Sequence, residues 1–135
     1  MANAWDIQGV VYKGGSCTLL ARVVGPDAVP IVQADIASAA YTVYLLDDAD
    51  PDAQAPVDGH EDVSLAVADC IYDELQTDAC WTADGDDVIG YNFRHTLDVA
   101  SEAAFAIAGR HYRVVVTLVP YAGQVILVRF RVRAI

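Results

Sequence analysis

Three arginines alternate with apolar residues near the end of the chain, at Arg129, Arg131 and Arg133. In a β-strand, residues two apart point to the same side, so these side chains should form one row on one face. We call them the arginine row. Guanidinium groups bind carboxylates through paired hydrogen bonds. The row therefore predicts a protein–protein interface, which Arg113 of the preceding predicted strand joins if it shares that face. The alternative is a charged outer surface that resists edge-to-edge aggregation.

Acidic residues gather in residues 47–62, here called the acidic loop. Asp48, Asp50 and Asp52 alternate as at the start of an EF-hand, but Ala53 stands at the glycine position and Gly59 at the glutamate position. An EF-hand is therefore excluded. A solvated loop is expected, with a looser calcium site as a weaker candidate. That candidate site uses Asp47, Asp48, Asp50 and Asp52, or else Asp84, Asp86 and Asp87.

The cysteines and histidines do not form a recognisable reactive set. The chain has three cysteines, Cys17, Cys70 and Cys80, which cannot all form disulfides with one another. Their spacing does not fit a zinc site either, so free thiols are predicted. A Cys70–Cys80 bridge is the alternative. The histidines are each expected to be structural: His60 in the acidic loop, His95 in an apolar strand, and His111 directed away from Tyr112.

Catalytic motifs are also missing from the sequence. There is no G-x-S-x-G elbow and no glycine-rich phosphate loop. The many aspartates lie in turns, where Asp bonds to local backbone. We therefore predict a protein without enzymatic activity or cofactor. A hydrolase with a Cys or Asp nucleophile is the most distant alternative.

Composition limits the partners. The chain has 135 residues with 8 Lys+Arg against 19 Asp+Glu, a net charge of −11, and 55% hydrophobic residues. That length and apolarity predict one folded domain over 1–135. The charge argues against nucleic acid and anionic membrane as partners. The first residues lack the basic and apolar regions of a signal peptide, and no transmembrane segment is predicted.

Alternating apolar and polar residues predict β-strands separated by turns. The expected strands are 7–12, 16–24, 40–46, 63–68, 89–97, 112–119 and 124–135, with 71–75 either a strand or a helical turn. Gly14 and Gly15 should form a hairpin turn after Lys13. The segment Ser101–Ile107 is the one expected helix. Together these predict an all-β, immunoglobulin-like antiparallel sandwich of about seven to nine strands.

A glycine followed three residues later by a tyrosine, Gly109 and Tyr112, opens the penultimate strand. This is the arrangement of a tyrosine corner, in which the hydroxyl bonds to upstream backbone. An ordinary core tyrosine is the alternative. Trp81, before the second acidic turn, is also expected to be structural.

Two segments suggest a family. Residues 7–16, IQGVVYKGGS, with the Gly109–Tyr112 ending, resemble the immunoglobulin-like N-terminal domains of phage baseplate proteins. Residues 70–82 and 90–95 are similar to small uncharacterised proteins encoded among phage structural genes. The resemblance implies a virion structural component in the baseplate, neck or capsid surface, assembled in the host cytoplasm. It brings no catalytic residues, and the long acidic loop departs from it.

We therefore expect a non-enzymatic assembly protein that contacts other virion proteins or further copies of itself. With the acidic loop at one end and the arginine row at another, subunits would associate head to tail. A calcium-assisted carbohydrate-binding module, using Trp5, Trp81 and Tyr121, is the alternative.

Overall fold

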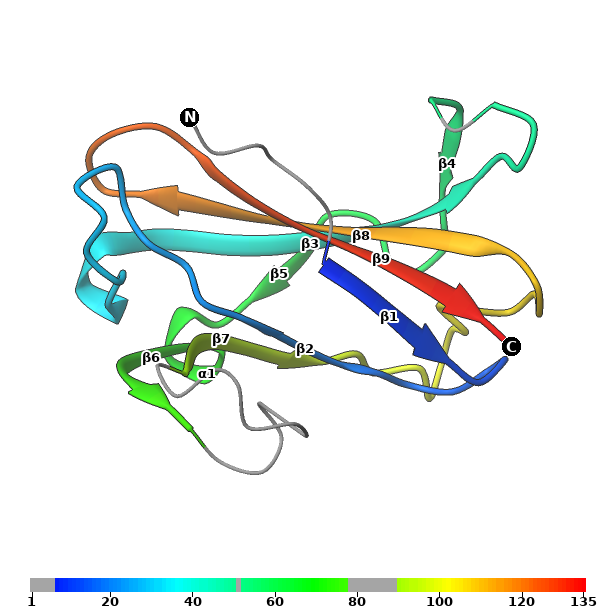
Figure 1. Cartoon of the computed structure of the whole chain (residues 1–135), viewed down its shortest axis with the longest axis horizontal. Helices are drawn as coiled ribbons and strands as arrows, with labels where there is room; N and C mark the ends of the chain where they lie inside the picture. Colours follow the sequence, from blue (N-terminus) through cyan, green and yellow to red (C-terminus); the bar gives the residue numbers. More distant parts are fainter. Residues whose placement is uncertain (1–6, 51, 78–89) are drawn as a thin grey trace.

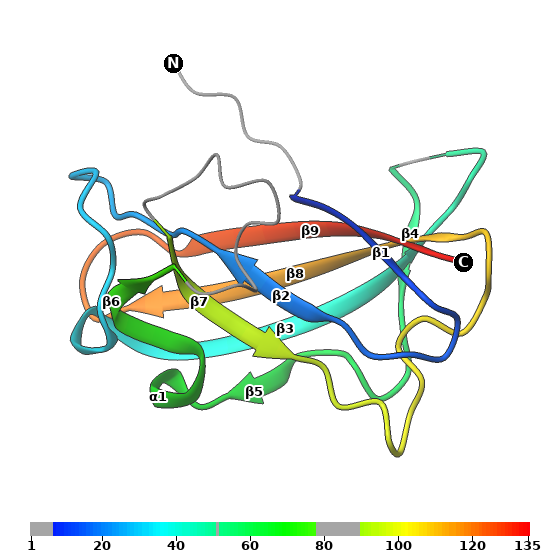
Figure 2. The ribbon, with the colours of Figure 1, turned by 60° about the horizontal axis from the view of Figure 1, so that its bottom comes forward.

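The computed structural model describes residues 7–50, 52–77 and 90–135. These residues form two β-sheets packed face to face, as Figures 1 and 2 show. The larger sheet has the strand order β1-β9-β8-β3-β4, with β5 also paired to β3, and the smaller sheet has the order β2-β7-β6. The chain is thus an all-β sandwich.

The strands of the larger sheet are β1 (Ile7–Val11), β3 (Ile36–Leu46), β4 (Gln54–Pro56), β5 (Val63–Leu65), β8 (His111–Pro120) and β9 (Ile126–Ala134). Those of the smaller sheet are β2 (Thr18–Ala21), β6 (Ile71–Gln76) and β7 (Tyr91–Thr96). A 3-10 turn, η1 (Gln33–Asp35), precedes β3, and one helical turn, α1 (Val67–Cys70), precedes β6. No helix in these described ranges is long and apolar enough to cross a membrane.

The strand order is that of an immunoglobulin-like sandwich. Strands β3, β8 and β9 occupy the places of strands C, F and G, while β2, β7 and β6 occupy those of B, E and D. One pair departs from the expected antiparallel arrangement, because β1 runs parallel to β9. The predicted hairpin at Lys13 is therefore wrong. That turn carries the chain from one sheet to the other.

The turn after β1 still needs its glycines. The Gly15 amide donates to the Tyr12 carbonyl at 2.8 Å, which closes a tight turn. Gly14 has φ +74°, a conformation that costs any residue with a Cβ atom. The sequence therefore predicted the turn and the strand on either side of it correctly, but not that the two strands belong to different sheets.

The core lies between the sheets and follows the alternation along the central strands. Val114, Val116 and Leu118 of β8 are fully buried, as is Val43 of β3. Phe93 of β7 packs against Phe130 of β9 with ring centroids 6.3 Å apart, which joins the two layers. Burying these side chains supplies the main stabilisation of the sandwich.

The helix predicted over Ser101–Ile107 is absent, and residues 101–107 form bends and part of a turn. Two backbone groups that a helix would pair internally are bound elsewhere. The Glu102 carbonyl accepts from His60 at 2.8 Å, and the Ile107 amide donates to the Tyr112 hydroxyl at 3.0 Å. Tertiary contacts therefore override a weak local helix preference.

Candidate protein-binding face

The arginine row lies on the outer side of β9, facing away from the core. Arg129 and Arg133 are exposed and Arg131 is half-buried, while the intervening Phe130 and Val132 are buried. The period-two alternation predicted from the sequence is thus present in the strand.

Neighbouring strand β8 adds two further basic side chains to this side. Arg113 pairs in register with Arg131, and His111 with Arg133, so basic groups stand opposite one another on adjacent strands. Like charges in directly opposite positions destabilise a sheet. We call the arginine row together with Arg113 and His111 the arginine face.

Among the described residues, the positions of the flanking strands that face Arg131, Arg133 and Arg113 are not acidic. On β1, Gln8 and Val10 lie opposite Arg131 and Arg133, and on β3 Tyr44 lies opposite Arg113. Arg113 donates from Nη1 to Oε1 of Gln54 on β4 at 3.2 Å. Within the described strands, therefore, no carboxylate occupies a register position beside these paired basic residues.

A shallow hollow opens at one end of the arginine face. It has a volume of about 360 Å³ and is lined by Gln8, Gly9, Val10, His111, Arg131 and Arg133. Its rim combines cationic groups with the exposed side chain of Val10. The hollow can therefore receive a partner side chain that carries a carboxylate.

The acidic loop lies at the same end of the sandwich as this hollow. The sequence-based expectation of head-to-tail association had placed the loop and the arginine row at different ends. It begins where β3 ends, next to the start of β8. Arg110 joins the two segments: its Nη2 donates to the Leu46 carbonyl at 2.9 Å, and its Nε lies 3.5 Å from Oδ2 of Asp48. Sequence reasoning did not single out Arg110, which fixes this arrangement.

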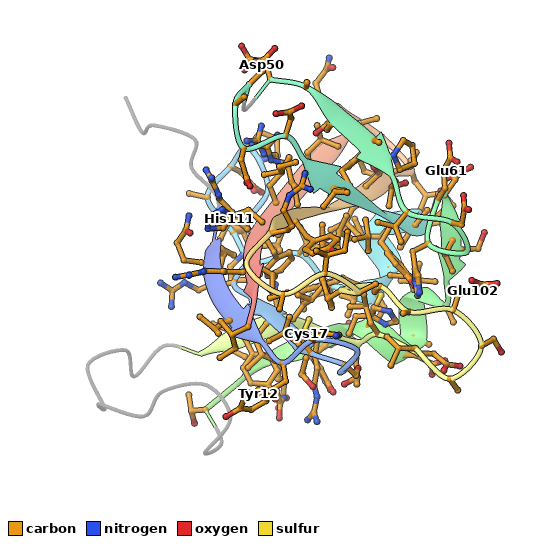
Figure 3. All side chains as sticks on the ribbon, turned by 90° about the vertical axis from the view of Figure 1, so that its right-hand side faces the viewer. Tyr12, Cys17, Asp50, Glu61, Glu102 and His111 are labelled. Atoms are coloured by element: carbon orange, nitrogen blue, oxygen red, sulfur yellow. The ribbon has the colours of Figure 1, made fainter. Side chains whose placement is uncertain are left out.

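Figure 3 looks onto this end of the molecule, with Asp50 at the tip of the loop and His111 at the side. Part of the acidic loop is also more ordered than expected, because β4 pairs antiparallel with the end of β3. The loop is thus built onto the sheet that carries the arginine face.

The carboxylates proposed for calcium do not converge. Oδ1 of Asp47 accepts from the amide of Ala49 at 2.8 Å, Oδ1 of Asp50 accepts from the amide of Asp52 at 3.1 Å, and Asp48 faces Arg110. Among the described residues, no three His, Cys, Asp or Glu side chains group as metal ligands. The second candidate set, residues 84–87, falls outside those residues.

His60 is buried and fully bonded within the fold. Its Nε2 donates to the Glu102 carbonyl at 2.8 Å, and Nδ1 lies 2.8 Å from the Tyr41 hydroxyl. Since the carbonyl only accepts, Nε2 is the donor to Glu102. His60 therefore ties the acidic loop to the 101–107 segment.

His95 differs from His60 in its bonding. Its ring lies 5.1 Å from that of Tyr41, and its Nε2 is buried without a hydrogen-bond partner among the described atoms. Burial lowers the pKa of His95 from its ordinary value. Burial, with the nearby Asp98 carboxylate, raises the pKa of Tyr41.

Two cysteines can be placed, and both are free thiols: Cys17 is half-buried and Cys70 buried. Burial raises the pKa of each thiol to about 11, with Asp69 adding to the effect at Cys70. Since the thiolate is the nucleophile, neither suits nucleophilic attack near neutral pH. Cys80 and Trp81 lie outside the described residues, as does Trp5.

The hydrogen bond expected for a tyrosine corner is present. The Ile107 amide donates to the buried Tyr112 hydroxyl at 3.0 Å. Gly109 lies between them with φ +86°, and its amide donates to the Ala134 carbonyl at 2.7 Å. These contacts fix the crossing into β8 and so the register of the arginine face.

The Asn92 side chain holds the backbone at Val23 and Ile31 in place, a role that the sequence did not predict. Its Oδ1 accepts from the Val23 amide at 2.7 Å, and its Nδ2 donates to the carbonyls of Val23 and Ile31 at 2.9 and 3.1 Å. The only sequence signal is a short polar residue between Tyr91 and Phe93 in an apolar strand. Its role depends on partners far away in the chain.

Tyr121, suggested for carbohydrate binding, lies at the other end of the sheet. It is 75% exposed beside a hollow of about 410 Å³ lined by Pro26, Val29, Pro30 and Pro120, among others. The acidic loop is at the opposite end of β3. The proposed calcium ligands and this aromatic side chain therefore do not form one site.

No protein-family model matches the chain, and no curated protein or solved structure shows significant similarity to it.

Proposed function

We propose that this chain is a non-enzymatic assembly protein that binds acidic protein surfaces through its arginine face. The carrying observation is the register of β8 and β9, which sets Arg113 opposite Arg131 and His111 opposite Arg133. Such a face costs the isolated subunit some stability. A partner that supplies carboxylates offsets this cost.

The chemistry of the face suits such a partner. Residues two apart on a strand are about 6.6–6.8 Å apart, so the arginine row presents evenly spaced guanidinium forks. Each fork can bind a carboxylate through two hydrogen bonds. The net charge of −11 disfavours a long polyanion such as nucleic acid, which would also meet the acidic surfaces of the chain.

Three side chains of types often used in catalysis, His60, Cys17 and Cys70, are not prepared for it in the described parts of the chain. His60 is bonded on both ring nitrogens, and the thiols of Cys17 and Cys70 have raised pKa values. These features favour binding over catalysis.

The setting we propose is a phage particle, where the chain is a baseplate, neck or capsid-surface subunit assembled in the host cytoplasm. This part of the proposal depends on the resemblance of residues 7–16, 70–82 and 90–95 to phage structural proteins. An immunoglobulin-like sandwich with one charged face suits repeated contacts between subunits in such an assembly.

Fluorescence anisotropy with a labelled peptide that carries Asp at alternate positions tests the binding face. Arg131→Glu should weaken binding about tenfold, equivalent to ~1.4 kcal/mol. Arg133→Glu, at an exposed position of the same row, should act in the same direction. Arg94→Glu makes the same charge change on β7 of the smaller sheet and serves as the matched control. Equal binding by the wild type and both arginine variants would refute the proposal.

A further inference from the structure

The arginine face and the acidic loop lie next to each other, and this adjacency restricts how subunits can pair. The loop follows β3 directly, while Arg110 at the start of β8 contacts both Leu46 and Asp48. The row of Arg133 and His111 is the last one of β8 and β9 at this end. One end of the larger sheet therefore carries a cationic surface beside an anionic one.

The loop presents its acids in a fixed form. The Asp47 carboxylate accepts hydrogen bonds from the amides of Ala49 and Asp50, and the Asp50 carboxylate accepts one from the amide of Asp52. The side chains of the turn therefore hold its backbone in place. The side chains of Asp50 and Asp52 are exposed. A preformed acidic turn loses little conformational entropy when it binds.

A positive and a negative surface that lie side by side on one molecule match the same pair of surfaces on a second copy rotated by 180°. A rotation of this kind places the loop of each copy over the arginine face of the other, and both contacts form at once. We propose that a second copy of this chain is the partner, joined about a two-fold axis with each acidic loop against the other copy's arginine face. This inference rests on the proposed function, and it replaces the head-to-tail arrangement expected from the sequence.

Apolar side chains around the face add to this contact. Val10, beside Arg133, is 64% exposed, and Leu127, two residues before Arg129, is 59% exposed. The hollow between Val10, His111 and Arg133 can take a side chain of the incoming loop. The contact thus combines charge pairing with apolar burial, as stable interfaces do.

The formation of such a dimer should depend on salt concentration, because each copy has a net charge of −11. At very low salt the two copies repel one another over long distances. At about 0.15 M salt, screening over ~8 Å suppresses this repulsion but leaves close ion pairs effective. At high salt the pairs weaken as well. The dimer fraction should therefore be greatest at intermediate ionic strength.

Sedimentation velocity and light scattering over a concentration series test the pairing. The wild type should reach twice the 14.5 kDa chain mass and rise no further. Arg131→Glu/Arg133→Glu and Asp50→Lys/Asp52→Lys should each be monomeric and folded by circular dichroism. An equimolar mixture of the two variants should restore the dimer, because both loop–face contacts again join opposite charges. Arg94→Glu and Glu74→Lys, on β7 and β6 of the smaller sheet, should dimerise as the wild type does.

Three results would overturn the inference. A wild type that stays monomeric while it binds the acidic peptide shows that the arginine face has another partner, which leaves the proposed function intact. A mass that keeps growing with concentration shows open chains in place of closed pairs. A dimer that persists in both charge-reversed variants shows a contact elsewhere on the molecule. Failure of peptide binding as well would refute the proposed function itself.

Discussion

The buried polar side chains and the arginine face differ in what surrounds their polar groups. Asn92, His60 and Tyr112 each bind backbone groups of the same chain. The arginine face instead sets basic groups opposite one another in the register of β8 and β9. The interior polar groups thus hold the fold together, whereas the arginine face is the surface that we propose binds a partner. Changes in the first should alter the free energy of unfolding, and changes in the second should alter association.

Asn92→Ala should cause the largest loss of stability. It leaves the buried Val23 amide and the Ile31 carbonyl without the bonds that the Asn92 side chain now supplies. Leaving one buried polar group unsatisfied costs about 1–3 kcal/mol, so a loss of ~3 kcal/mol is expected in urea unfolding. Thr96→Ala, an exposed site on the same strand that loses only its hydroxyl contact with Thr18, should cost ~1 kcal/mol or less. Equal losses for the two variants would show that Asn92 does not hold this segment.

Tyr112→Phe should have a smaller effect. The ring stays in the core against Phe105, but the Ile107 amide loses its acceptor. We expect the free energy of unfolding to fall by about 1 kcal/mol, with the fold retained. Tyr44→Phe is the matched control, since the Tyr44 hydroxyl has no partner in the described part of the chain. An unchanged urea midpoint in Tyr112→Phe would exclude a stabilising tyrosine corner.

The sequence predicted features that depend on local spacing. The alternation of β8 and β9, the arginine row and the Gly109–Tyr112 corner all follow from residues at most a few positions apart. It did not predict features set by distant partners. Asn92 binds backbone 69 residues away, and His60 binds the Glu102 carbonyl across 42 residues.

Those long-range contacts also explain two errors. The helix expected at Ser101–Ile107 is replaced because His60 and Tyr112 bind its backbone. The acidic loop and the arginine row were expected at separate ends, whereas the strand order places β3 next to β8 and brings them together. Charge counts along a sequence give no information on which strands become neighbours.

His95 allows the finest test, because it is a half-buried residue whose buried Nε2 lacks the bonding of His60. Its pKa is lowered in the folded state by burial, so the unfolded chain binds the proton more readily. Its contribution to stability is therefore complete above about pH 6.5, the ordinary histidine pKa, and is lost as pH falls through the lowered folded value. His95→Leu removes this contribution and should lessen the loss of stability between pH 7 and pH 5.

The measurement is the difference in unfolding free energy between wild type and His95→Leu at each pH. At pH 8 the imidazole is neutral in both states, so the difference there reports packing against Tyr41 alone. Any further change in that difference at lower pH belongs to the imidazole, and it should be the smallest of the three effects because the side chain is only half-buried. The dimer mass at pH 8 should stay that of the wild type, because His95 is on the smaller sheet, away from the arginine face. A difference that does not vary with pH would show that His95 titrates alike in the folded and unfolded chain.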